Sequence, residues 1–538
     1  MIVLGLHGGV TVNQHEPAAA LAVNGRIVAL CEEERYLRIK SSYGYLPFYS
    51  IKACLDAAGI KFEQVDLVVT PGITYKDHFD LRIADYLRHH FGRAPKVERV
   101  HHQMAHLAAA FYGSGYDEAL CLALDASGDG ACGMVGHGTR AGGIRAVEEI
   151  PTANSLGYYY TLMTHYLGFN DGDEYKLMGL APYGKPTIDL GPVVKPTNGG
   201  WKLNQDFLRS DPPTKSPFEP LYSPKLTDLL KQPNRLPGAP LTDFHRDVAR
   251  STQAHFETCL LSLVDSARRR VPGVRNFCYA GGVALNCAAN REIFYSDRFD
   301  HVYVSPVASD RGLAAGCAYL GAVMCGDTPW QMHNPYLGTS YAGDGIRKEL
   351  EANGSRFEEV DDAAEAAAEL LAEGKMIGWF QGRSEAGARA LGNRSILAPA
   401  GDAKIRDMVN ARIKYREEFR PFAPSALHDD AGIYFKTDGA DFPTMSITVD
   451  AQPGMADRLR AVVHVDNTAR LQTVRSTDNE LYYELLRTYK AKTGVSVILN
   501  TSFNLKGQPI VETPRDALMT FHGCGLDALV VGNFVIRK

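Results

Sequence analysis

The chain has 538 residues, of which 45% are hydrophobic and 22% are charged. This length exceeds one ordinary hydrophobic core and predicts two or three domains, and the composition is that of a globular protein. The formal net charge of −5 offers no basic footprint for a nucleic-acid backbone, which argues against a polynucleotide substrate.

The first 35 residues carry strong hairpin signals. A similar strand–turn–strand outline returns between residues 118 and 147, where a glycine-rich turn follows the first strand. Two such strand–turn–strand units are typical of a duplicated actin-like, ribonuclease-H-like fold, and predict that fold here. The predicted elements of the first unit are strands at 1–9, 18–23 and 26–31, with a polar turn at 11–15.

Two histidines, His102 and His106, lie four residues apart after an extended segment. On a helix such side chains share one face, with Cβ atoms about 5–6 Å apart, so one metal ion can bind both. Asp125 ends an apolar strand, where open α/β sheets place ligand-binding groups, and Asp310 follows the strand-like segment 302–305. Two imidazoles and two carboxylates suit Fe(II), Mn(II) or Zn(II). The alternative is a pair of surface or capping histidines without a metal.

The middle of the chain predicts a long amphipathic helix at 247–270, then a strand that ends in Gly281-Gly282 before another helix. Free N–H groups at that helix start would let an anion or a nucleotide approach, whereas close strand–helix packing is the plainer explanation of the glycines. An irregular stretch at 330–338 predicts an interdomain connector. We therefore expect one domain at 1–340 and a second at 341–538.

The second domain begins with an alanine-rich helix at 362–373 and a strand at 376–380, and a later strand at 495–499 leads into a predicted polar turn at 500–507. Guanidinium groups match phosphate oxygens, so a cluster of arginines in an acidic protein indicates a small, highly charged phosphate compound. A solvated face paired with Glu417, Glu418 and Asp429 is the alternative. The basic residues of this block are Arg383, Arg389, Arg394, Lys414, Arg416 and Arg420, with Arg470 further on.

The ten cysteines are scattered and contain no C-x-x-C pair, so we expect reduced core residues in a cytoplasmic protein. The apolar N-terminus has no basic leader region and predicts a first strand in place of a signal peptide. No apolar run approaches the length of a membrane span.

Taken together, these blocks resemble the carbamoyltransferase family that includes nodulation and antibiotic-tailoring O-carbamoyltransferases. The chain departs from the family at His15-Glu16-Pro17, where His-Asp-Ser is usual, and at Lys506, where Arg is common. The blocks that carry the resemblance are 15–20, 32–35, 102–106, Asp125, 174–184, 280–286, 310–312, 387–394, 414–424 and 500–507.

The resemblance implies an actin-like metal- and nucleotide-binding domain at 1–340. It also implies a smaller α/β domain of the threonylcarbamoyl-adenylate-synthase type at 341–538. Carbamoyl phosphate and ATP would give carbamoyl adenylate in the smaller domain, and the large domain would transfer the carbamoyl group to a hydroxyl of a sugar, an antibiotic or another natural product. Fe²⁺ is favoured as the metal, Mn²⁺ and Zn²⁺ are the alternatives, and Mg²⁺ is a further candidate co-ion.

The resemblance also assigns residues. His15 is the candidate general base for the acceptor hydroxyl, because an imidazole titrates near neutrality, and Asn13 lies beside it. Lys414 and Arg420 are assigned to catalysis, with the metal held by His102, His106, Asp125 and Asp310. The remaining substrate and nucleotide ligands are Arg389, Arg470, Asn504 and Lys506, together with Lys40, Ser155, Tyr158, Gly281, Gly282 and Asn286 for an adenylate pocket in the large domain.

Three other functions compete. A hydrogenase-maturation carbamoyltransferase should carry C-x-x-C zinc pairs, which this chain lacks. A tRNA threonylcarbamoyl-type transferase is disfavoured by the acidic charge and the fused basic domain. A non-catalytic actin-like regulator would bind nucleotide regardless of His102.

Overall fold

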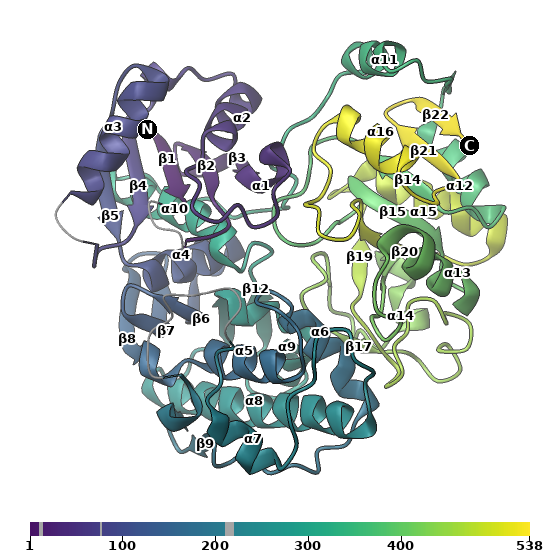
Figure 1. Cartoon of the computed structure of the whole chain (residues 1–538). Coiled ribbons are helices and arrows are strands. Elements are labelled where there is room, and N and C mark those ends of the chain that lie inside the picture. The colour runs from purple at the N-terminus through teal and green to yellow at the C-terminus, as the bar shows by residue number, and fades with distance from the viewer. Residues whose placement is uncertain (10–13, 76–77, 210–219) are drawn as a thin grey trace. The chain divides into compact units, whose positions relative to one another are not determined.

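The computed structural model describes residues 1–9, 14–75, 78–209 and 220–538. Contacts divide the chain into two compact units (Figure 1). Unit 1 comprises residues 1–6, 24–26 and 66–332, and unit 2 comprises residues 7–23, 27–65 and 333–538. The segment 27–65 therefore groups with the C-terminal third of the chain.

The elements that lie mainly in unit 1 are β1 (Ile2–His7), β4 (Leu67–Pro71), α3 (Phe79–Phe91), β5 (Lys96–Val100), α4 (His102–Ser114), β6 (Glu118–Gly128), β7 (Ala131–Thr139), β8 (Gly143–Pro151), α5 (Leu156–Tyr166), α6 (Glu174–Leu180), β9 (Val194–Thr197), β10 (Gly200–Leu203), α7 (Pro224–Leu230), α8 (Asp243–Arg270), β11 (Asn276–Ala280), α9 (Cys287–Phe294), β12 (His301–Val304) and α10 (Leu313–Met324).

The elements that lie mainly in unit 2 are β2 (Ala18–Val23), β3 (Arg26–Glu32), α1 (Glu33–Leu37), α2 (Tyr49–Ala58), α11 (Gly343–Ala352), β13 (Glu358–Glu359), α12 (Ala363–Ala372), β14 (Ile377–Phe380), β15 (Arg394–Pro399), α13 (Ala403–Met408), β16 (Ala423–Leu427), α14 (Ala431–Tyr434), β17 (Val449–Asp450), β18 (Thr468–Ala469), β19 (Gln472–Val474), α15 (Glu480–Thr493), β20 (Val497–Ser502), α16 (Pro514–His522), β21 (Ala528–Val531) and β22 (Phe534–Arg537).

Unit 1 contains a five-stranded sheet of order β12-β11-β6-β7-β8, in which β6, β11 and β12 run parallel and β6, β7 and β8 form an antiparallel meander. Strands β1, β4 and β5 also run parallel to one another. A set of three parallel strands thus occurs twice in this unit. The full duplicated fold stays a prediction beyond this coarse α/β topology.

Helices α4 and α10 pack against each other, with α4 also on β6 and α10 also on β4. Both helices are rich in alanine and are buried on nearly all sides, as expected for helices that are apolar all round. A Cβ atom added to Gly316 would lie 1.9 Å from the carbonyl oxygen of Ala105, so the two helices approach each other backbone to backbone at this glycine. This contact fixes the helix that carries both predicted metal-binding histidines.

Unit 2 contains an eight-stranded mixed sheet of order β13-β22-β21-β14-β15-β20-β16-β19. Helices α12 and α15 pack together over its core, where Trp379, Tyr482 and Ile498 have no exposed surface. The apolar faces of these two helices cover the buried strand residues, which is the layered arrangement of an α/β domain.

Most predicted elements are confirmed within a few residues. Helix 247–270 is α8, helix 362–373 is α12, and strand 376–380 is β14. One expectation is wrong: residues 500–502 do not begin a turn but complete β20, because the buried Asn500 amide is satisfied inside the core by Ala390 and Ser425. All ten cysteines lie among the described residues; none of them forms a disulfide, and nine are buried. Among the described residues, no helix combines the length and the apolar character that crossing a membrane requires.

Candidate functional site

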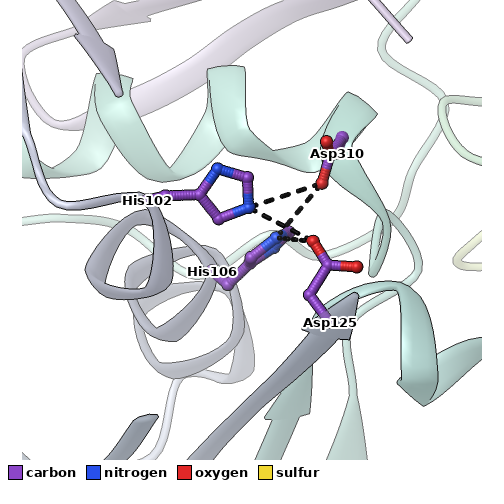
Figure 2. Close-up of side chains that lie close together, drawn as sticks. All are labelled: His102, His106, Asp125 and Asp310. Atoms are coloured by element: carbon purple, nitrogen blue, oxygen red, sulfur yellow. Dashed lines mark hydrogen bonds and ion pairs between the residues drawn. The ribbon is translucent and has the colours of Figure 1, made fainter. Parts of the chain in front are cut away.

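His102 and His106 lie on the first turns of α4, and their rings point into the same space (Figure 2). His102 is 7% exposed and His106 is fully buried. His101 precedes the helix and accepts a hydrogen bond from the Gln103 amide at 3.1 Å through its Nδ1 atom, which starts the helix at His102. The predicted helical spacing is therefore present, and the alternative of exposed surface histidines does not describe this pair.

Two carboxylates face these rings from other elements (Figure 2). Asp125 follows Leu124 on β6, where the pairing with β7 becomes irregular, and Asp310 opens the 3₁₀ turn before α10. The His102 Nε2 atom lies 3.2 Å from Asp125 Oδ2 and 3.6 Å from Asp310 Oδ1. The His106 Nε2 atom lies 3.6 Å and 3.4 Å from the same two oxygens. All four ligand atoms lie within 4.8 Å of one another.

The donor set fits a divalent metal. Among the described residues, neither ring nitrogen of the buried His106 has a hydrogen-bond partner, although an unpaired buried polar atom is unfavourable. Burial opposes ionisation of Asp125, but its interactions with His102 and His106 outweigh burial and hold the pKa of this carboxyl well below its ordinary value. Two carboxylates and two imidazoles suit Fe(II), Mn(II) or Zn(II).

Asp129 is not singled out by the sequence, yet it anchors the start of α4, the helix that carries the two candidate histidine ligands. Its carboxylate accepts hydrogen bonds from the His102 amide at 2.8 Å and from the Thr74 amide and hydroxyl at 3.1 and 2.7 Å. A Cβ atom on the neighbouring Gly128 would lie 2.3 Å from the His102 ring. The only sequence signal for both roles is the Gly128-Asp129-Gly130 turn itself, whose contacts are distant in the chain.

The predicted nucleotide turn lies against the end of β6. Gly281 has φ 91°, and a Cβ atom there would meet the Leu124 carbonyl oxygen at 2.0 Å. A Cβ atom on Gly282 would lie 2.8 Å from Asp125 Oδ1. The glycines therefore let this turn approach the candidate metal centre closely.

The other predicted residues of the adenylate pocket have structural partners. Ser155 caps α5 by accepting the Tyr158 amide at 3.0 Å, and its hydroxyl lies 3.4 Å from the Asp125 carbonyl oxygen. Burial raises the pKa of Tyr158. The buried Asn286 caps α9 at the Ala289 amide and exchanges hydrogen bonds with Gln253 at 3.0 and 3.1 Å.

In unit 2 the sheet register brings the predicted anion ligands to one edge. The first residues of β15 and β16 pair with the last residues of β20, and β19 runs parallel to β16. The segments before β15, β16 and β19 and the segment after β20 therefore leave the sheet at the same edge. They carry Arg389, Arg420, Arg470, Asn504 and Lys506.

Lys414 ends a π-helical turn (Val409–Lys414) and is buried at this edge. Its ammonium donates to the Ser502 carbonyl, to the Ser502 hydroxyl at 3.2 Å, and to the carbonyl and side-chain oxygens of Asn504 at 3.1 and 2.7 Å. Burial, and then the positive charges of Arg416, Arg420 and Lys40, lower the pKa of Lys414 well below its ordinary value.

Lys40 belongs to unit 2, as Lys414 does, and its charge lowers the pKa of Lys414, although the resemblance assigned Lys40 to the adenylate pocket of the large domain. The buried Nε atom of Arg470 has no hydrogen-bond partner among the described residues. Arg420 lies 3.8 Å from Glu417, which is one of the pairs that the solvated-face alternative requires. The charges of Arg416, Arg420 and Lys40 nevertheless act together on Lys414.

Other arginines of the basic block donate hydrogen bonds to backbone carbonyl groups. Arg394 is fully buried, lies 3.7 Å from the Phe380 ring centroid, and donates to the Gln381 carbonyl at 2.6 Å. Arg383 donates to the carbonyls of Gly338 and Val28, both at 2.9 Å. Composition alone could not separate these residues from the predicted anion ligands, since both kinds share one stretch of chain.

His15 lies in unit 2, where its carbonyl oxygen is 3.0 Å from the His7 ring and its own ring lies 5.4 Å from that of Tyr43. The predicted neighbour Asn13 lies outside the described residues. The acceptor role of His15 stays a prediction.

Comparison with known proteins identifies related sequences. Residues 74–319 match the family model described as carbamoyltransferase N-terminus, and residues 368–538 match that described as carbamoyltransferase C-terminus. The nodulation protein NolNO of Sinorhizobium fredii is 35% identical, over 100% of this chain and 83% of its own. The nodulation protein NolO of Bradyrhizobium diazoefficiens is 38% identical, over 82% of this chain and 79% of its own.

The 3'-hydroxymethylcephem-O-carbamoyltransferase of Streptomyces clavuligerus is 32% identical, over 58% of this chain and 60% of its own. Among solved structures, T. kodakarensis HypF is 14% identical over 60% of this chain and 48% of its own, with a TM-score of 0.32. That likeness is too low to support an argument about the fold.

Proposed function

The chain belongs to the carbamoyltransferase family, and from that premise we propose that it is an ATP-dependent O-carbamoyltransferase acting on the hydroxyl of a small molecule. The observation that carries the proposal is the convergence of His102, His106, Asp125 and Asp310 within 4.8 Å of one another. A family relative whose name gives a hydroxymethyl cephem as its acceptor supports the hydroxyl class.

Activation is proposed for unit 2. Carbamate is a poor electrophile until one oxygen becomes part of a phosphate-type leaving group. Water cleaves carbamoyl phosphate to carbamate and inorganic phosphate, and a carbamate oxygen attacks the α-phosphorus of ATP, so that pyrophosphate leaves and carbamoyl adenylate forms. Lys414, Arg420 and Arg389 would bind the phosphate groups, with Arg470, Asn504 and Lys506, and would stabilise the charge that develops there.

Transfer is proposed for the centre in unit 1. His102, His106, Asp125 and Asp310 would hold a divalent ion, with Fe²⁺ favoured over Mn²⁺ and Zn²⁺. When bound, such an ion polarises carbonyl or phosphoryl oxygens. The turn at Gly281-Gly282 would approach the adenylate. The acceptor oxygen attacks the carbamoyl carbon, its proton passes to a general base, and AMP leaves; His15 is the candidate for that base.

The proposal predicts that the two half-reactions can be separated. In the His102→Ala variant, carbamoyl transfer should fall at least about hundredfold and the bound metal should be lost, because one metal ligand is gone. Exchange of labelled pyrophosphate into ATP in the presence of carbamoyl phosphate should remain within about twofold of the natural protein. Lys414→Met should abolish both reactions. Metal content is measured by mass spectrometry alongside both assays.

His137→Ala is the matched control, since His137 lies on β7 in the same unit and pairs with Glu118 at 2.7 Å. It should leave both half-reactions intact. Transfer at the natural rate in His102→Ala would overturn the proposal, whereas pyrophosphate exchange in the absence of any transfer to a broad panel of hydroxylated metabolites would favour a nucleotide-binding regulator.

A further inference from the structure

Four consecutive charged residues at the junction of β3 and α1 are buried. Glu32, Glu33, Glu34 and Arg35 are 3%, 1%, 6% and 2% exposed. Such residues are rarely buried unless they are paired. The proposed function uses none of them.

Glu33 and Glu34 hold the loop that carries Lys40. The Glu33 carboxylate accepts the Tyr49 amide at 3.0 Å and both the amide and the hydroxyl of Ser50 at 2.7 Å, which fastens the far end of the loop at the start of α2. Glu34 accepts the amide of Ser41 at 2.7 Å, one residue after Lys40. Both ends of the loop are therefore bonded to neighbouring residues of one short segment.

Glu32 and Arg35 hold the loop that carries Arg389. Glu32 accepts the Gly387 amide at 2.6 Å, and Arg35 donates to the Gly387 carbonyl at 2.9 Å. Burial disfavours the charge of Arg35, but the carboxylates of Glu32, Glu512 and Glu385 outweigh burial and raise its pKa. The backbone of Gly387 is thus fixed on both sides, two residues before Arg389.

Arg38, one turn further on, holds the loop that follows β20. Its guanidinium donates to the Ile510 carbonyl at 2.6 Å and to the Pro509 carbonyl at 3.0 Å, and it lies 3.5 Å from Asp516. Asn504 and Lys506 stand earlier in the same loop. A planar guanidinium bonded to two carbonyls fixes orientation as well as distance.

We propose that the segment 32–38 is a positioning device, which sets the spacing of three loops that deliver Lys40, Arg389 and Lys506 to the anion-binding edge of unit 2. The inference rests on the proposed function, because it assumes that this edge binds a phosphate group, and it assigns residues that the chemistry leaves without a role. They are positioning residues and do not touch the substrate. Binding sites need such support, since a ligand misplaced by 1 Å can lose about a hundredfold in rate.

The test compares Arg38→Ala with Arg140→Ala in the full-length protein. Arg140 in unit 1 is a matched control: it also donates to two carbonyls, of Pro329 at 3.1 Å and Gly115 at 2.9 Å, and pairs with an aspartate, Asp117, at 3.6 Å. Carbamoyl phosphate binding is measured by isothermal titration calorimetry, and stability by thermal unfolding. Arg38→Ala should weaken binding on the order of tenfold, whereas Arg140→Ala should leave affinity unchanged at a comparable loss of Tm.

A second pair keeps the test decisive if Arg38→Ala folds poorly. Glu34→Gln retains an oxygen for the Ser41 amide and should bind carbamoyl phosphate nearly as the natural protein does, whereas Glu34→Ala should bind it several-fold more weakly. Natural affinity in folded Arg38→Ala or folded Glu34→Ala would overturn the inference while leaving the proposed function standing. A natural protein that binds neither carbamoyl phosphate nor inorganic phosphate would overturn the proposed function itself, and the inference with it.

Discussion

Lys414 is buried, and its ammonium has four oxygen acceptors. The positive charges of Arg416, Arg420 and Lys40 also act on it. The acceptors favour the ammonium form, but burial and the charges of Arg416, Arg420 and Lys40 lower its pKa. A phosphate dianion placed beside it would favour the ammonium form and raise the pKa again. The residue is therefore poised to couple protonation to anion binding.

The direction of proton transfer on anion binding, uptake or release, can be measured. At a pH above the pKa of Lys414 in the free protein and below its pKa in the complex, binding of carbamoyl phosphate should take up as much as about one proton, and affinity should fall as pH rises through that window. Calorimetry above about pH 7.5, where a phosphate monoester is fully ionised, should then give binding enthalpies that differ between buffers of different ionisation enthalpy. Lys414→Arg, which stays charged, should bind without proton uptake. A buffer-independent enthalpy in the natural protein would contradict this prediction.

At the residue scale, the sequence could predict the four metal-ligand candidates because each carried a local signal: helical spacing for the histidines, and the ends of apolar strands for Asp125 and Asp310. Asp129 and Arg38 carried no such signal. Their partners, Thr74 and Ile510, are distant in the chain, and only the folded backbone brings them together. The roles of Arg389 and Arg394 could not be separated for the same reason.

Among the elements, the pair α4 and α10 depends on backbone proximity at Gly316. Replacing Gly316 by alanine should force the helices apart, destabilise the protein by about 1–3 kcal/mol, and loosen the two histidines that are candidate metal ligands. Gly345→Ala in α11 is the control, because an added Cβ there meets no atom within 4 Å, and it should be neutral or stabilise by about 0.5–1 kcal/mol through helix propensity. Denaturant unfolding and metal content report the two effects. Equal stability of the two variants would argue against close helix packing as the constraint.

Hydrophobic periodicity located the helices and strands well, because long segments such as α8 and α12 are strongly amphipathic or alanine-rich. Periodicity ended β20 too early, because the polar Asn500 is typical of a turn. In the structure its side chain is buried with Gln472 and Ser425. Pairing of polar side chains across neighbouring strands is a tertiary property, and no local pattern reports it. Strand order is equally invisible to periodicity.

For the molecule as a whole, the units defined by contacts interleave along the chain. Removing residues 1–332 would leave Glu512, which is 1% exposed, without Arg35 at 3.8 Å, and would leave the Gly387 backbone without either partner. Breaking one buried charged pair costs about 3–5 kcal/mol, against a total stability of about 5–15 kcal/mol for a typical domain. A fragment of residues 333–538 should therefore lack a cooperative thermal transition.

The fragment is compared with the full chain by calorimetry and circular dichroism. A soluble fragment with a sharp unfolding transition would show that segment 27–65 is dispensable to unit 2.

The long-range contacts of the segment 32–38 also have a consequence during translation. Arg35 is separated from Gly387 by 352 residues, and Arg38 from Ile510 by 472. At the roughly 5–20 residues per second of translation, the nascent segment waits roughly 20–90 s for these partners to leave the ribosome. During that interval Glu32, Arg35 and Arg38 lack their distant partners, and the packing of unit 2 around this segment can be completed only after those partners have been synthesised.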